Sequence, residues 1–114
     1  MAKDKERGGI KMIGMFGSYV TDSIPVGTDL VDLIYEQEKL RYPDFTVLKN
    51  RKDFSLVNFN LTAPAGTSIL LNGSEYCRVV INETRQLIIP NDYFKVTSCV
   101  FETDVAGINC RYLY

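Results

Sequence analysis

Histidine and tryptophan are both absent from the 114 residues of this chain, and neither sign of charge predominates. Without histidine the chain lacks the usual general base near neutral pH, the commonest metal ligand and the base of Ser-His and Cys-His pairs. Thirteen basic residues against fourteen acidic ones give a net charge of −1, which offers no electrostatic attraction to nucleic acid. We therefore expect a protein that is not an enzyme, holds no cofactor or metal, and does not bind nucleic acid.

Long apolar runs and closely spaced cysteines are missing as well. Residues 1–9 are polar, and no stretch reaches the ~18 apolar residues of a membrane-spanning helix, so we predict neither a secretion signal nor a membrane segment. Cys77, Cys99 and Cys110 are too far apart in sequence for a typical zinc site. We interpret them as reduced core residues; the alternative, one disulfide and one free thiol, requires an oxidising compartment.

The chain has the length and composition of one globular domain, with 46% apolar and 24% charged residues. Its sequence pattern divides it into two unlike parts. Residues 1–27 are predicted to form a flexible tail followed by an extended arm. Residues 28–114 are predicted to form a single β-sandwich domain with a leading helix over 29–41.

The predicted arm mixes apolar residues with small ones. Met12, Ile13, Met15, Phe16 and Tyr19 are interleaved with glycines, and glycine disfavours a helix. An extended strap that docks on a neighbouring subunit would suit this pattern. The alternative is a first strand of the domain's own sheet.

The predicted helix has sequence signals at both ends. Thr28 stands where an N-cap belongs, and Pro43 ends the run. Apolar residues at helical spacing define the buried stripe, namely Leu30, Leu33, Ile34 and Leu40, with Gln37 in the same register. The acidic residues Asp29, Asp32, Glu36 and Glu38 are predicted to form a solvated outer face.

From residue 45 onward the apolar pattern has a period of two, which is typical of strands. Short strands are predicted at 45–47, 55–61, 69–71, 74–81, 86–89, 96–101 and 108–114, the last two as a pair. Asn72–Gly73 between two apolar runs indicates a hairpin with a type I′ turn. Seven or eight short strands at this spacing predict a mainly β fold, an antiparallel β-sandwich of immunoglobulin-like or jelly-roll-like type.

Tyrosine and arginine, which are common in protein interfaces, are concentrated at the end of the chain, in Arg111–Tyr114. Tyr93, beside a predicted turn, allows a different interpretation, in which loop tyrosines bind carbohydrate.

The second half of the chain also has a familiar order of strands and turns. Phe59–Thr67 leads into Ile69–Gly73, and Leu87–Pro90 and Val96–Phe101 follow. This half resembles small β-modules in virion proteins of tailed bacteriophages. The resemblance implies a structural protein located in the virion, present in repeated copies or as a homo-oligomer and bound to other virion structural proteins. It transfers no site residues, because it lies in the turns and strands.

Taken together, these patterns predict a non-enzymatic virion structural protein that binds capsid or tail subunits through its N-terminal arm and the surface of its β-domain. The alternative function is a carbohydrate-binding or adhesion module that uses loop tyrosines. The residues expected to contact the partner are Met12, Ile13, Met15, Phe16, Tyr19, Tyr112 and Tyr114.

Overall fold

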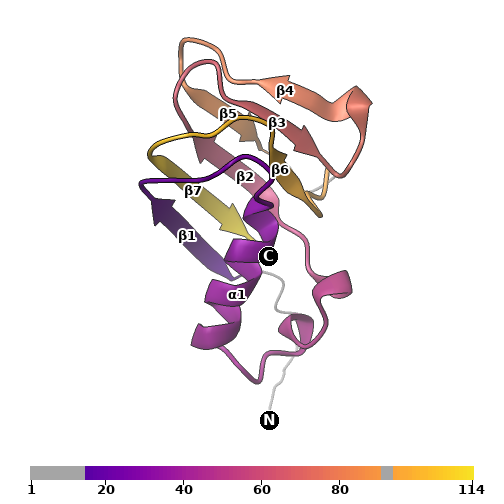
Figure 1. Cartoon of the computed structure of the whole chain (residues 1–114). Coiled ribbons are helices and arrows are strands. Elements are labelled where there is room, and N and C mark those ends of the chain that lie inside the picture. The colour runs from indigo at the N-terminus through magenta and orange to yellow at the C-terminus, as the bar shows by residue number, and fades with distance from the viewer. Residues whose placement is uncertain (1–14, 91–93) are drawn as a thin grey trace.

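The computed structural model describes residues 15–90 and 94–114, and within them seven strands form two antiparallel sheets. The four-stranded sheet has the order β1-β7-β2-β5, with β1 at Phe16–Thr21, β7 at Ile108–Leu113, β2 at Val57–Thr62 and β5 at Gln86–Ile89. The three-stranded sheet has the order β4-β3-β6, with β4 at Arg78–Val80, β3 at Ser68–Leu71 and β6 at Cys99–Phe101. The predicted antiparallel β-sandwich with one helix is confirmed (Figure 1).

Both sheets and the helix contribute to a single hydrophobic core. Phe59 of β2, Ile69 of β3 and Phe101 of β6 are all fully buried. Each large side chain removed from water in this way stabilises the fold by about 1.5–3 kcal/mol. The core therefore holds the two sheets together and fixes which face of each sheet is left to solvent.

The predicted arm is, from Phe16 onward, a strand of the domain itself. β1 pairs antiparallel with β7 along its whole length, and Met15 exchanges backbone hydrogen bonds of 2.7 and 3.0 Å with Tyr114. This is the alternative that the sequence left open, and it moves the start of the domain upstream of residue 28. Along β1 the exposed residues Phe16, Ser18 and Val20 alternate with half-buried ones, a pattern that suits a strand covered on one side. Residues 1–14 lie outside the described part of the chain.

The helix α1 spans Leu30–Arg41 and begins one residue later than predicted. Its N-cap is Asp29, not Thr28: the Asp29 carboxylate accepts a hydrogen bond of 3.0 Å from the Val31 backbone N–H. The Asp29 carboxylate also accepts a hydrogen bond of 2.8 Å from the Cys99 N–H, which ties the start of the helix to β6. Figure 1 shows α1 descending from the region of the two sheets.

The buried face of α1 is rotated relative to the predicted stripe. Its buried residues are Leu30, Val31, Ile34, Tyr35 and Glu38. Leu40, predicted to be in the stripe, is 85% exposed, whereas Glu38, predicted to be solvated, is fully buried. The prediction was wrong for these two residues because hydrophobicity alone placed the stripe, and a partner for the carboxylate was not visible in the sequence.

No strand forms at residues 45–47, which corrects another prediction. Thr46–Leu48 is a short 3₁₀ helix (η1), and Arg51–Asp53 is a second one (η2). Phe45 packs against the core from the side, and Leu48 is buried. A run this short has the same apolar pattern whether it is a strand or a single helical turn.

A bulge in β2 changes which residues of that strand face the core. Asn58 has a φ of +48°, and the pairing of β2 with β7 shifts at this point. Phe54 and Leu56 are buried before the bulge, and Phe59 and Leu61 are buried after it. The strict alternation predicted over 55–61 therefore fails at Asn58, because a bulge adds one residue to the strand.

The predicted hairpin is confirmed, with a longer connection than its turn signal suggested. Asn72 and Gly73 have φ values of +56° and +68°, and the Ser74 N–H bonds to the Leu71 carbonyl at 3.2 Å, as in a type I′ turn. A third 3₁₀ helix, η3 at Glu75–Cys77, follows before β4 begins. Because η3 separates the turn from β4, the pairing with β3 begins at Arg78, which lies opposite Leu70.

The last two strands belong to different sheets and are not a pair. β6 pairs with β3, and β7 lies between β1 and β2. The free edge of β6 is covered by the segment before α1, since the Phe101 N–H bonds to the Thr28 carbonyl at 2.9 Å and the Gly27 N–H to the Phe101 carbonyl at 2.8 Å. The segment 102–107 is thus a crossing between the sheets and not a hairpin loop.

Candidate interaction surface

The four-stranded sheet has one face on the core and one face turned to solvent. Along β1 and β7 more exposed side chains alternate with more buried ones, as expected for strands covered on one side. We call the solvent side of this sheet the outer face. Its residues are Phe16, Ser18, Val20, Asn60, Thr62, Gln86, Ile88, Asn109, Arg111 and Leu113.

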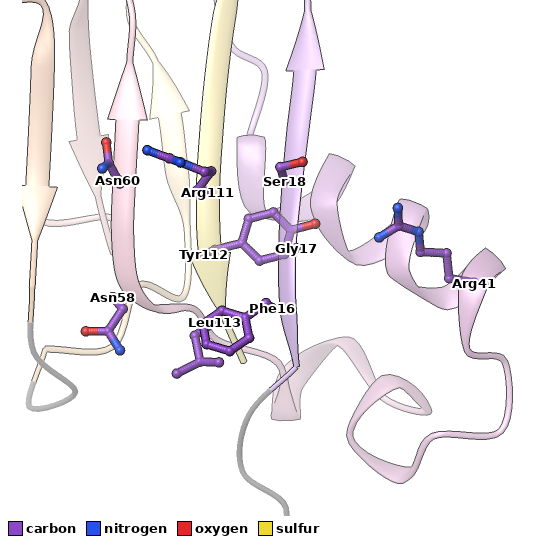
Figure 2. Close-up of a pocket in the computed structure, with 9 residues that line it drawn as sticks. All are labelled: Phe16, Gly17, Ser18, Arg41, Asn58, Asn60, Arg111, Tyr112 and Leu113. Carbon is purple, nitrogen blue, oxygen red and sulfur yellow. The ribbon is translucent and has the colours of Figure 1, made fainter.

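Strand pairing sets these residues in rows across the sheet. Phe16 lies opposite Leu113 near one end of the strands. In the next row Ser18 lies opposite Arg111, and Arg111 lies opposite Asn60. Figure 2 shows Phe16 and Leu113 together, with Arg111 and Asn60 further along the strands. The outer face therefore combines an apolar corner with a polar row beside it.

A groove of about 580 Å³ follows this part of the outer face and reaches the end of α1. The residues that line it are Phe16, Gly17, Ser18, Arg41, Asn58, Asn60, Arg111, Tyr112 and Leu113 (Figure 2). This lining contains two guanidinium groups and two amide side chains but no carboxylate. The groove is therefore rich in hydrogen-bond donors and favours contact with acceptor groups, such as backbone carbonyls.

The strongest apolar exposure on the outer face lies on the edge strand β1. Phe16 is 80% exposed and Val20 is 68% exposed, and both point to the same side of the strand. Ile88 on the opposite edge strand, β5, is 53% exposed. Large apolar side chains that stay this exposed on a paired strand add nothing to the core, so they are free to contact another molecule.

Gly17 leaves room for the Tyr112 side chain on the core side of β1, directly behind the groove. A Cβ atom at Gly17 would lie 2.5–2.6 Å from atoms of the Tyr112 ring, which occupies that space. Tyr112 thus lies across β1 on the core side and reaches α1. An aromatic ring that covers a glycine on an edge strand in this way fixes the register of the strand pair.

The buried Glu38 carboxylate accepts hydrogen bonds from two tyrosine hydroxyls, one in β7 and one at the last residue. Glu38 of α1 is fully buried and accepts hydrogen bonds from the Tyr112 hydroxyl at 2.5 Å and the Tyr114 hydroxyl at 2.7 Å. Arg41 lies 3.3 Å from the same carboxylate, and Gln37 donates to the Tyr112 hydroxyl at 3.0 Å. The buried charge is thus satisfied, as the low-dielectric interior requires.

The same contacts change the acidity of the two tyrosines. The pKa of Tyr112 is raised, first by burial and then by its hydrogen bond to the Glu38 carboxylate. The pKa of Tyr114 is raised for the same two reasons. Both hydroxyls therefore stay protonated as donors, and this cluster joins α1 to the four-stranded sheet.

The structure separates the predicted contact residues into three groups. Phe16 is exposed to solvent on the outer face, and its contact with a partner stays a prediction. Tyr112, which is 2% exposed, is instead an internal residue, because its hydroxyl is held by Glu38. The remaining described ones, Met15, Tyr19 and Tyr114, are half-buried. Met12 and Ile13 lie outside the described residues, as does Tyr93 of the carbohydrate-binding alternative.

All three cysteines are free thiols, as predicted for reduced residues. Cys99 and Cys110 are buried in the core, and Cys77 is half-buried. Burial raises the pKa of Cys110 from its ordinary 9.0 to about 12 and raises that of Cys99 well above its ordinary value. A thiol that remains protonated at neutral pH is a poor nucleophile.

Other charged side chains make contacts within the fold. Arg51 bonds to Asp32 at 2.6 Å and to the Thr97 carbonyl at 2.8 Å, which ties η2 to α1 and to the segment before β6. Arg78 and Glu102 form a two-pronged ion pair with distances of 2.9 Å, and it links β4 to the residue after β6. Between residues 15 and 114, outside the 91–93 gap, no cluster of three metal-binding side chains occurs.

Sequence reasoning missed Gly17 and Glu38 as members of this region, and it noted Arg111 only as part of the interface-like composition of Arg111–Tyr114. Gly17 is one of the glycines that disfavour a helix in the predicted arm, and the close approach that it permits is to the Tyr112 ring of the same chain and not to a neighbouring subunit. The position of Arg111 on the outer face could have been predicted from the alternation along β7, which places it on the side opposite to Cys110 and Tyr112. Glu38 gave no local signal, because its partners are more than 70 residues away.

No family model, no characterised protein and no solved structure matches this chain. Within the described residues, no helix has the length and apolar character needed to cross a membrane.

Proposed function

We propose that this chain is a non-enzymatic structural protein of a virus particle, which binds neighbouring subunits through the outer face and the edge strand β1. The observation that carries the proposal is the exposure of Phe16 and Val20, at 80% and 68%, on one side of a strand held firmly by β7. Interface anchors are typically large apolar side chains presented by a rigid element, and burying Phe16 alone would contribute about 1.5–3 kcal/mol.

The use of the reactive side chains within the fold supports a structural role. The Glu38 carboxylate is occupied by two tyrosine hydroxyls, and the core thiols of Cys99 and Cys110 have raised pKa values. Asp29 caps α1, and Arg51 bridges elements. Groups of these kinds perform chemistry in enzymes when they face a cleft, whereas here they stabilise a platform for the outer face.

The assignment to a virus particle rests on the sequence resemblance of residues 59–114 to β-modules of tailed-phage virions. Such modules attach to other virion structural proteins in repeated copies. Repetition suits a small surface, because many weak contacts in one assembly give a high total affinity. Met12 and Ile13 precede β1 directly in the sequence and remain predicted contact residues.

The test is whether the chain is a component of purified particles of the virus that encodes it. Quantitative mass spectrometry should recover its peptides in constant ratio to the major capsid or tail protein through successive purification steps. Loss of the peptides on purification would refute the proposal.

Variants identify the surface involved. Phe16→Glu should lower the incorporated amount by at least about tenfold, since it places a charge where an apolar contact is expected. Val26→Glu is the matched control, because Val26 is 58% exposed but lies outside the outer face, and it should be incorporated normally. Equal incorporation of both variants would contradict the role of β1.

A further inference from the structure

The outer face and its groove carry charge of one sign. Among the described residues of the outer face, Arg111 is the only charged one, although acidic residues slightly outnumber basic ones in the whole chain. Arg41, at the end of α1, adds a second guanidinium group to the lining of the groove, and Figure 2 shows β1 between the two arginines. A surface with guanidinium groups and no carboxylate attracts an anionic partner and repels a cationic one.

The Arg111 guanidinium is not used by the fold. Arg41, Arg51 and Arg78 each lie within 3.3 Å of a carboxylate oxygen. In the part of the chain that the structure describes, Arg111 has neither such a carboxylate nor a side-chain hydrogen bond. It extends into solvent from β7, a central strand held between β1 and β2. An arginine without a partner on a rigid central strand is well placed to bind a ligand.

Two further hydrogen-bond donors flank Arg111 in its row of the sheet. The strand register places Ser18 on one side of it and Asn60 on the other, each one strand spacing of about 4.8 Å away. The Ser18 hydroxyl and the Asn60 amide both carry donors, and a guanidinium group binds both oxygens of a carboxylate at once. A carboxylate above this row would therefore be held from β1, β7 and β2 together.

The apolar corner of the outer face lies at a fixed distance from this row. Phe16 lies opposite Leu113, and this pair is two residues along the strands from the row of Arg111, or about 7 Å. In an extended peptide, alternate side chains point to the same side at the same spacing. An acidic side chain over Arg111 therefore places the side chain two residues away over the apolar corner.

We propose that the groove binds an extended acidic segment of a neighbouring protein subunit, with a carboxylate on Arg111 and an apolar side chain two residues away on Phe16 and Leu113. The inference rests on the proposed function, for which it gives the chemistry of the partner. At about 580 Å³ the groove lies in the size range of ligand sites, ~300–1,000 Å³. Residues 1–14 of this chain carry more basic than acidic side chains, so their charge does not match the groove.

Binding of a short synthetic peptide to the full chain tests this match. The probe is Leu-Thr-Asp-Thr-Leu with blocked ends, in which an apolar residue lies two positions from the acid in both directions along the peptide. It should shift the backbone amide NMR signals of Ser18, Asn60 and Arg111, a readout suited to dissociation constants of about 1 mM. It should bind about fivefold more tightly than Leu-Thr-Asn-Thr-Leu, which lacks the charge. Absence of binding would overturn the inference.

A second peptide tests the spacing. Leu-Asp-Thr-Thr-Leu has the same composition, but its acid lies one and three positions from the leucines, on the opposite side of an extended chain. It should bind as weakly as the asparagine peptide. Equal affinities of the two aspartate peptides would overturn the inference, because charge alone would then account for the binding.

Variants of the chain test the role of Arg111. Arg111→Gln should weaken binding of Leu-Thr-Asp-Thr-Leu about fivefold, since it removes the two-pronged contact. Lys52→Gln is the matched control, because it makes the same change of charge at an exposed residue of η2, outside the outer face, and it should leave the affinity unchanged. The amide spectrum of each variant verifies that the sandwich is intact. Equal effects of the two substitutions would contradict a specific contact at Arg111.

Two further results would identify a different occupant and overturn the inference. Shifts of the same amide signals on raising the concentration of the chain without peptide would indicate a second copy. The N-terminal segment of the chain would be indicated if Asp4→Asn combined with Glu6→Gln raised the peptide affinity at least about tenfold, since a tethered competitor would have been removed.

The outcomes for this inference and for the proposed function are distinguishable. Loss of Phe16→Glu from purified particles, together with peptide binding that does not depend on Arg111, would leave the proposed function standing with a partner of different chemistry. Binding of the acidic peptide that depends on Arg111, by a chain that is missing from purified particles, would instead refute the proposed function and keep the inference.

Discussion

At the scale of single residues, the Glu38 carboxylate connects the helix to the end of the chain. It is fully buried and is bound by Tyr112 and Tyr114, two residues of the C-terminal tetrapeptide. Removal of one member leaves buried polar groups without partners, and such groups are more destabilising than the lost hydrogen bond itself. Tyrosines at the chain end, expected from composition to form a contact surface, thus contribute largely to the interior.

Glu38→Ala should lower the free energy of unfolding by about 2–4 kcal/mol, since it empties a buried position and leaves the Tyr112 hydroxyl without its acceptor. Urea denaturation followed by tyrosine fluorescence measures this change. Glu36→Ala is the control, because Glu36 is exposed on the same helix, and its effect should stay within about 0.5 kcal/mol. Similar effects of the two substitutions would contradict the structural role of Glu38.

At the scale of elements, β1 combines an interior contact with an exposed edge. On the core side, Gly17 makes room for the Tyr112 ring, and on the other side Phe16 and Val20 face solvent. Glycine is needed at this position because of the close ring and not because of its backbone angles. The same ring that holds β1 against β7 brings Tyr112 to α1, so the docking of the strand and of the helix is coupled.

Gly17→Ala should destabilise the protein by about 1–3 kcal/mol through overpacking against Tyr112. In a Tyr112→Leu background the alanine should cost less than about 0.5 kcal/mol, because the ring that it would contact is gone. A double-mutant cycle of unfolding free energies measures the coupling. An equal penalty in both backgrounds would mean that the strain arises elsewhere on β1.

At the scale of the whole molecule, the core holds several weak acids in their protonated forms. Their folded pKa values lie above their unfolded ones, so the stability that they contribute is complete below the unfolded pKa. As pH rises, the unfolded chain releases protons first, which favours unfolding. The groups concerned are Cys99, Cys110, Tyr112 and Tyr114.

The urea midpoint should therefore be steady up to about pH 9, the ordinary pKa of the thiol, and fall continuously above it. For Cys110 the loss extends to about pH 12, where its folded pKa lies. Denaturation curves at pH 8, 9.5 and 11 measure the decline. Tyr114→Phe should reduce the slope above pH 10, since it removes one titrating hydroxyl. A midpoint that stays constant to pH 11 would contradict this account.

The sequence by itself determined the fold class, the hairpin at Asn72–Gly73 and the helix to within one residue. These features depend on local patterns: a period of two along the strands, positive φ at adjacent turn residues, and capping residues beside an apolar stripe. Phe16 was named from the sequence as a contact residue, which stays a prediction, whereas its exposure followed only from the alternation along β1.

Only the tertiary structure decided the strand order, the inclusion of β1 in the sheet and the burial of Glu38. Each depends on groups far apart in the chain: β1 requires β7, more than 80 residues later, and Glu38 requires Tyr112 and Tyr114, more than 70 residues later. Local patterns carry no information on such partners, since the free energy of a buried carboxylate or an edge strand is set by what is packed beside it.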